Sequence, residues 1–212
     1  VALGVNALDA ITTADSVTAL GYGALGALTT GGSNTAVGVE AMLTTTSGNN
    51  NVALGLRALS TNTIGDRSTA LGYQALNTSD PASNADVYNV AVGYNAGYAL
   101  TTGTSNTFIG SLAGDKVTTA GSNTAVGYAA GGSNTAATGN YNSALGLSAL
   151  QNTTTAANNT AVGAFAMQNA TTGGNNAALG TYALDALTTG TDNTAIISEL
   201  ATLLLQLQLR EI

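Results

Sequence analysis

A glycine that follows an aliphatic residue recurs through this chain at an almost constant interval. The members of this column are Gly4, Gly21, Gly38, Gly55, Gly72, Gly93, Gly110, Gly127, Gly146, Gly163 and Gly180. Consecutive members are 17 residues apart, except for one step of 21 and one step of 19. A twelfth copy lacks the glycine and places Ile197 at the next step. A fixed period of this kind indicates one structural unit repeated along the chain.

Other columns keep the same register, which separates a structural repeat from biased composition. The residue before the glycine is always Leu, Val or Ile, and Ala stands three residues after it in all eleven copies. Two residues before the glycine Ala is replaced only by Phe108, and four residues before it Asn predominates. The unit reads N-T-A-V-G-x-x-A-L followed by a Thr-rich turn, as in residues 34–41 and 123–130.

A period of 17 residues predicts one coil of a β-solenoid, because helical repeats need about 30 residues or more. We therefore expect an all-β fold, a parallel β-solenoid (β-roll) of about eleven 17-residue coils over residues 1–195. Coils stacked about 4.8 Å apart would form a rod roughly 50 Å long. Strand alternation puts Thr, Val and Tyr on one face and Ala and Gly on the other. We expect the aliphatic column to form the core, the Asn column to bond between rungs, and the flat Ala/Gly wall to favour self-association.

Three segments depart from the repeat. The two longer coils place their extra residues within 77–88 and 131–142, which we expect to form loops on the outside. In residues 196–212 glycine disappears and helix formers dominate, and a 3,4,3 spacing predicts a short C-terminal helix or coiled-coil segment. The members of that spacing are Ile197, Leu200, Leu204 and Leu207. A strand is the alternative, since Leu205, Leu207 and Leu209 alternate with glutamines. The chain starts at Val1 without an initiator Met, and we expect it to be part of a longer protein.

The composition excludes several classes of function. Only 7% of residues are charged, His and Cys are absent, and the net charge is -7. Four basic residues (Arg57, Arg67, Lys116 and Arg210) cannot form a phosphate-binding surface, so nucleic acid is not an expected partner. The apolar stretch 200–209 is too short to span a bilayer, and we expect no membrane insertion. We expect no cofactor and no catalytic, cofactor-binding or metal-binding residue, and hence no enzyme; the G-x-G-x-x-G at 21–26 follows from the glycine-rich repeat.

The Gly, Ala and Asn columns carry a resemblance that covers residues 1 to about 195. The unit N-T-A-V-G-x-x-A resembles the head repeats of trimeric autotransporter adhesins (YadA-like), whose rungs carry an N-S-V-A-I-G core. It is similar also to the N-T-A-V-G-Y-x-A-L arrays of bacteriophage tail fibres. The resemblance implies a homotrimer of parallel β-rolls, displayed outside a cell or on a virion. Seventeen residues is longer than the usual adhesin rung, and no binding residue of the family transfers to this chain.

These observations predict a structural fibre or adhesin segment, a trimeric extracellular or virion-surface rod that presents a binding surface for host attachment. Its expected partners are itself and a cell-surface glycan or protein receptor. Two alternatives stay open: a tail-spike-like polysaccharide-degrading protein, and a monomeric ice-binding solenoid that uses stacked Thr pairs. The pairs are Thr12–Thr13, Thr29–Thr30, Thr101–Thr102, Thr118–Thr119, Thr154–Thr155, Thr171–Thr172 and Thr188–Thr189.

The tyrosines divide into two groups. Four of them, Tyr22, Tyr73, Tyr94 and Tyr128, directly follow the repeat glycine, and we expect them to pack within one ladder. The other four, Tyr88, Tyr98, Tyr141 and Tyr182, lie outside that column, and of these Tyr88 and Tyr141 fall in the two extended segments. They are the candidate binding residues, with a sugar as the expected ligand.

Overall fold

A computed structural model describes residues 1–83, 86–132 and 137–196 of the chain. Each repeat contributes one short strand, which ends just before the repeat glycine. The strands are β1 (Ala2–Leu3), β2 (Thr18–Leu20), β3 (Thr35–Val37), β4 (Val52–Leu54), β5 (Thr69–Leu71), β6 (Val90–Val92), β7 (Thr107–Ile109), β8 (Thr124–Val126), β9 (Ser143–Leu145), β10 (Thr160–Val162), β11 (Ala177–Leu179) and β12 (Thr194–Ile196).

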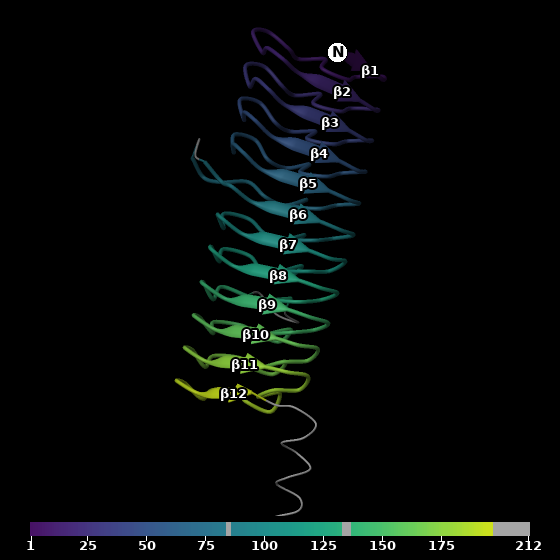
Figure 1. The fold of residues 1–212 in the computed structure, drawn as a ribbon. Coiled ribbons are helices and arrows are strands. Elements are labelled where there is room, and N and C mark those ends of the chain that lie inside the picture. The colour runs from purple at the N-terminus through teal and green to yellow at the C-terminus, as the bar shows by residue number, and fades with distance from the viewer. Residues whose placement is uncertain (84–85, 133–136, 197–212) are drawn as a thin grey trace, which may run out of the picture.

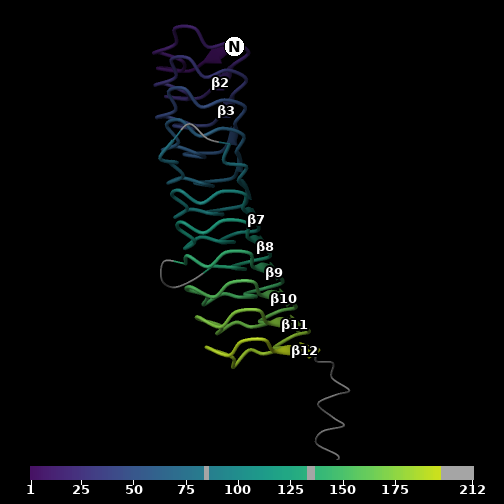
Figure 2. The ribbon, with the colours of Figure 1, turned by 90° about the vertical axis from the view of Figure 1, so that its left-hand side faces the viewer.

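All twelve strands belong to one parallel sheet in chain order, and this confirms the predicted solenoid. The pairing follows the repeat register: Ala36 lies beside Ala53. The register also holds across the longer coils, where Ala70 lies beside Ala91 and Ala125 beside Ala144. The twelfth copy, which lacks its glycine, still forms β12 beside β11. Figures 1 and 2 show the rungs stacked one above the next into a rod whose two ends are β1 and β12.

The two faces of the sheet are the reverse of our expectation. The middle residue of each strand points into the coil: Ala36 and Ala53 are fully buried. The aliphatic residue before the glycine points outward, and Leu54 is 51% exposed. The Ala column is therefore the core wall, and the aliphatic column is surface. The physical reason is thinness, because the opposite wall of so short a coil lies too close for a large inward side chain on the strand.

The opposite wall supplies the bulk of the core. Three and four residues after the glycine, an Ala and then a larger apolar residue are buried. The larger residues include Leu25, Met42, Leu59, Leu76, Leu150 and Met167. They adopt φ between 46° and 52°, a left-handed conformation that L residues rarely adopt. Complete burial offsets that strain, since hiding a Leu or Met side chain contributes about 1.5–3 kcal/mol.

Phe108 is the one large residue of the inward Ala column, and it is fully buried because the facing wall carries glycines in place of its larger residues. The larger residue is there replaced by Gly97 in the preceding coil and by Gly114 in its own. A Cβ at Gly114 would lie 2.5 Å from the Phe108 ring, and one at Gly97 would lie 2.8 Å away. The ring fills the space that two Leu side chains occupy in other coils. A small cavity borders the next coil, where Ala125 faces Gly131 and both are small.

The Asn column forms the rung-to-rung ladder that the sequence predicts. The Asn34 side-chain oxygen accepts from the Asn51 backbone N–H at 2.9 Å, and the Asn34 amide donates to the Gly48 carbonyl at 2.7 Å. The same pattern recurs from Asn89 through Asn193. These buried amides satisfy backbone groups at the coil corner, and an unpaired group there would cost about 1–3 kcal/mol. The ladder lacks its amide at Ser68, in the coil before the longer insertion.

The repeat glycines are required by backbone geometry. Gly55 has φ of 135°, and a Cβ there would lie 2.3 Å from the carbonyl oxygen of Gly72 in the next coil. Only a residue without a side chain allows the chain to bend there while neighbouring coils stay in contact.

The two longer coils gain their extra residues at defined points. Asp80 hydrogen-bonds to Thr63 and Val87 to Asp66, which places the first insertion between Asp80 and Val87. The second insertion lies between residues 132 and 137, since the Thr118 N–H donates to the Ala137 carbonyl at 3.0 Å, as the Thr101 N–H donates to the Thr118 carbonyl one coil earlier. Of the segment 196–212, predicted as a helix or coiled coil, Ile196 is the last residue of β12, and residues 197–212 lie outside the described part of the chain.

Candidate functional site

The outward face of the sheet carries three columns of side chains that contain no charged residue. The columns are the residue three before the repeat glycine (mostly Thr or Val, with Ser143 and Ala177 as exceptions), the Leu, Val or Ile that ends each strand, and the residue after the glycine. We call these three columns the outer face. Its apolar side chains are exposed or half-buried; the exposed ones include Leu145 at 51%, Leu179 at 50% and Tyr128 at 55%. The face follows the whole described rod, from β1 to β12, and monomeric proteins rarely expose continuous apolar strips of that extent.

The tyrosines after the glycine lie on this outer face. Tyr73 and Tyr94 occupy neighbouring rungs, and their rings stack with centroids 5.2 Å apart and planes 8° apart. This stack bears out the expected ladder packing for that pair. Tyr22 and Tyr128 have no aromatic neighbour in the column. All four rings are between 43% and 55% exposed.

The Thr pairs divide into two columns with different roles. The first hydroxyl of a pair bonds within the rod: Thr29 donates to the Thr46 carbonyl and Thr171 to the Thr188 carbonyl, both at 3.0 Å. The second residue of a pair is exposed, as at Thr30 and Thr172. The first column therefore stabilises the stack, and only the second offers its hydroxyls to solvent as a surface.

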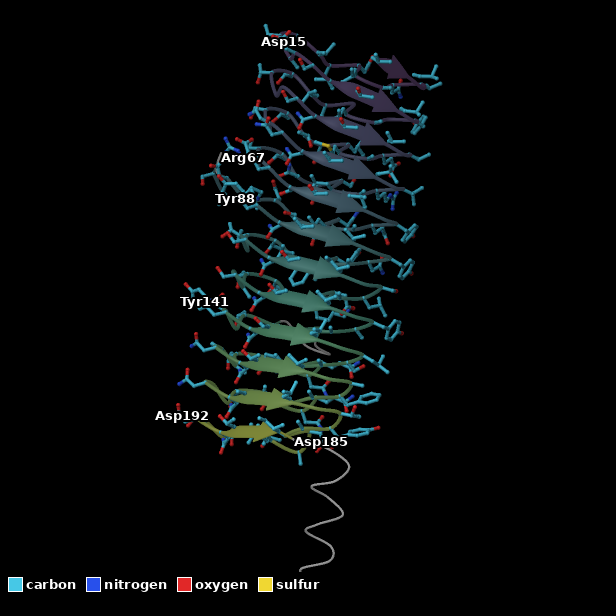
Figure 3. The ribbon with its side chains drawn as sticks, viewed as in Figure 1. Asp15, Arg67, Tyr88, Tyr141, Asp185 and Asp192 are labelled. Carbon is cyan, nitrogen blue, oxygen red and sulfur yellow. The ribbon has the colours of Figure 1, made fainter. Side chains whose placement is uncertain are left out.

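Tyr88 and Tyr141 lie at the corner of the coil, five residues before the repeat glycine. We call this position the corner column; its members are Ser16, Ser33, Asn50, Arg67, Tyr88, Ser105, Ser122, Tyr141, Asn158, Asn175 and Asp192. Both tyrosines follow the insertions and occupy the regular repeat position, which corrects their assignment to the extended segments. Figure 3 shows Arg67, Tyr88, Tyr141 and Asp192 along one long edge of the rod. Tyr88 is 52% exposed and Tyr141 is 64% exposed.

Two charged residues hold the Tyr88 ring. Its hydroxyl donates to the Asp86 carboxylate at 2.8 Å, and the Arg67 guanidinium lies 5.7 Å from the ring centroid. Arg67 and Asp86 also form an ion pair. The sequence interpretation missed this cluster, although Arg67 and Tyr88 occupy the same column in consecutive coils. Such a cation over an aromatic ring contributes about 0.5–1 kcal/mol at an exposed site.

The other ion pairs are local. Arg57 pairs with Glu40 of the preceding rung, and this contact raises the pKa of the guanidinium. Lys116 lies 3.6 Å from Asp115, whose pKa is raised because burial opposes its charge more than Lys116 supports it. Over residues 1–83, 86–132 and 137–196, no three acidic side chains gather into a group that could hold a metal ion.

Comparison with known proteins adds no relative. No family model matches the chain, and neither a search of curated proteins nor one of solved structures finds a match. Among the described residues there is no helix long and apolar enough to cross a membrane.

Proposed function

We propose that this chain is a structural rod displayed on a cell surface or a virion, where it holds a binding surface for host attachment. Three copies associate in parallel through the outer face, with their long axes side by side. The rod carries no chemistry of its own. The observation that supports this proposal best is the exposed, uncharged outer face, which runs the length of the described solenoid.

The physical case for self-association rests on the size and shape of this face. Each rung adds Leu, Val, Ile or Tyr side chains to a surface that water covers in a single chain. Removing apolar surface from water contributes about 25 cal/mol per Å², and a strip of twelve rungs offers far more area than scattered surface residues. An identical strip on another copy matches it rung for rung. Closed symmetry about an axis parallel to the rod covers every such strip. The sequence resemblance favours three copies.

The proposal is tested by the solution mass from light scattering. We expect a mass near three times that of the 20.7 kDa chain. The variant Leu54→Lys/Leu145→Lys places charges in the middle of the outer face and should shift the mass to one chain, since a buried unpaired charge is strongly unfavourable.

A matched control carries the same charges elsewhere. Thr30→Lys/Thr172→Lys changes two exposed residues of the second Thr column and should keep the mass of the unmodified protein. Circular dichroism should show that both variants keep their β-structure. A single-chain mass for the unmodified protein, or an unchanged mass for the outer-face variant, would contradict the proposal.

A further inference from the structure

We propose that the edge from Tyr88 to Tyr141 binds a neutral, extended polysaccharide chain, with one tyrosine stacked on a sugar ring at each end. This inference deepens the proposed function, because it names the class of ligand that the displayed rod would contact. The binding strip consists of Tyr88, Ser105, Ser122 and Tyr141, four consecutive members of the corner column.

The two tyrosines share the strained backbone conformation of the corner column. Every member of the corner column has φ between 51° and 60°, in the left-handed region. Eight of the eleven are Ser, Asn or Asp; Asn and Asp adopt this region most readily. An aromatic residue there is disfavoured. Burial compensates the Leu and Met side chains that share this conformation in the core, but Tyr88 and Tyr141 are 52% and 64% exposed. Tyr182 is also exposed and has φ of 59°, but its ring stacks on Phe165. Strain that no such packing compensates is typical of functional positions.

The Tyr88 ring is oriented before any ligand arrives. Asp86 holds its hydroxyl, and Arg67 lies over one face of the ring. The ring is still half exposed, so it offers a fixed aromatic surface to a ligand. This coil is also the one that follows Ser68, where the Asn ladder lacks its amide. The repeat is therefore broken at three neighbouring places: the Asn ladder at Ser68, the insertion between Asp80 and Val87, and the corner column at Tyr88. Departures that coincide in this way indicate a position selected for function rather than for stability.

The backbone beneath the strip is rigid. The Ser105 N–H donates to the Val87 carbonyl at 2.7 Å, and the Ser122 N–H donates to the Thr104 carbonyl at 2.9 Å. The Tyr141 N–H donates to the Gly121 carbonyl at 3.3 Å. Each corner is therefore tied to the coil before it. The strip keeps its spacing in the unbound state, which lowers the entropic cost of binding.

The spacing and charge of the strip select the ligand. Three rungs at about 4.8 Å separate the two tyrosines by roughly 14 Å, and one rung is close to the length of one pyranose in a β-1,4-linked chain. Sugar rings of such a chain present flat C–H faces that stack on aromatic rings, while the exposed Ser105 and Ser122 can bond to hydroxyls between them. Arg67 is neutralised by Asp86, so the strip offers no unpaired cation to an acidic glycan.

The test is a calorimetric titration with cellohexaose and chitohexaose, two neutral β-1,4-linked hexasaccharides. At least one should bind, and the corresponding disaccharide should bind about tenfold more weakly because it cannot reach both tyrosines. Tyr88→Ala and Tyr141→Ala should each weaken the hexasaccharide about tenfold and should abolish the dependence on chain length. Tyr88→Phe keeps the ring and should retain most of the affinity.

Tyr182→Ala is the matched control, since it removes a ring that is 52% exposed but lies two residues after the repeat glycine and stacks on Phe165. Its hexasaccharide affinity should be unchanged. The inference is overturned if neither hexasaccharide binds, or if the Tyr88 and Tyr141 variants bind as the unmodified chain does. Light scattering of the same samples separates this result from a failure of self-association, because the strip lies outside the outer face and its variants should keep the mass of the unmodified protein.

Discussion

The inward and outward positions of one strand differ in the size of side chain they hold. Ala53 faces inward and is fully buried, whereas its neighbour Leu54 faces outward and is 51% exposed. An ordinary half-buried sheet does the opposite and turns its large apolar residues to the core. In this thin coil the facing wall supplies the bulk, through residues such as Leu59. The strand contributes a methyl group to the core, and its larger residues lie on the exposed outer face.

The largest loss of stability is expected at Phe108, the strand residue that replaces Ala in the inward column. Phe108→Ala should destabilise the rod by about 3–5 kcal/mol, since removal of a buried ring leaves a cavity. Adding Gly114→Leu should restore part of that loss. It recreates the Ala and Leu pair of the regular coils, and Gly114 already has φ of 61°, near that of the buried Leu residues. Urea denaturation of both variants measures the difference. If Gly114→Leu destabilises the Phe108→Ala variant further, the facing glycines are not what makes room for the Phe108 ring.

A substitution in the buried Asn ladder is expected to destabilise the rod nearly as much as Phe108→Ala does. Asn106 accepts from the Asn123 N–H at 3.0 Å and donates to the Ala120 carbonyl at 2.9 Å. Asn106→Ala leaves both groups buried and unpaired, with an expected loss of about 2–4 kcal/mol. Hydrogen exchange should show the Asn123 amide losing protection first. The exposed Thr102→Ala is the control and should change stability by less than about 0.5 kcal/mol, because Thr102 lies outside the ladder and has an ordinary backbone conformation. Equal losses for the two variants would show that the ladder does not stabilise the interior.

A larger side chain at an ordinary inward position should be unfavourable. Ala53→Leu places three carbons against the facing wall, and overpacking of this kind costs about 1–3 kcal/mol. Combining it with Leu59→Gly should relieve the clash, as Gly97 and Gly114 do beside Phe108. Thermal unfolding is the measurement. An unaffected midpoint for Ala53→Leu would mean that the core has unused volume and that thinness does not explain the small inward residues.

The sequence predicted the solenoid because its columns are set by backbone geometry that any coil shares. A glycine such as Gly55 must bend and contact the next coil, and an amide such as Asn34 must satisfy a corner carbonyl. The inward face was predicted wrongly, because alternation gives two faces but does not say which one is inside. That choice depends on the thickness of the coil, which is a property of the opposite wall.

The candidate site was predictable in part for a similar reason. Tyr88 was found by its position in an extended segment, but its partners were not, since no spacing in the sequence indicates that Asp86 and Arg67 meet at its ring. The left-handed conformation of Tyr141 cannot be predicted from Tyr141 itself. It follows from the Ser, Asn and Asp residues that share its column.

The smallest effect on the chain itself is expected on the outward face. Leu179→Ala removes an apolar group that is 50% exposed and makes little contribution to the core. The free energy of unfolding of a single chain should change by less than about 0.5 kcal/mol. Association should weaken, so the melting temperature should fall at high protein concentration and converge with that of the unmodified chain on dilution. A loss that is the same at every concentration would mean that Leu179 stabilises its own coil. The division of the strand into an inward core face and an outward surface face would then not hold for β11.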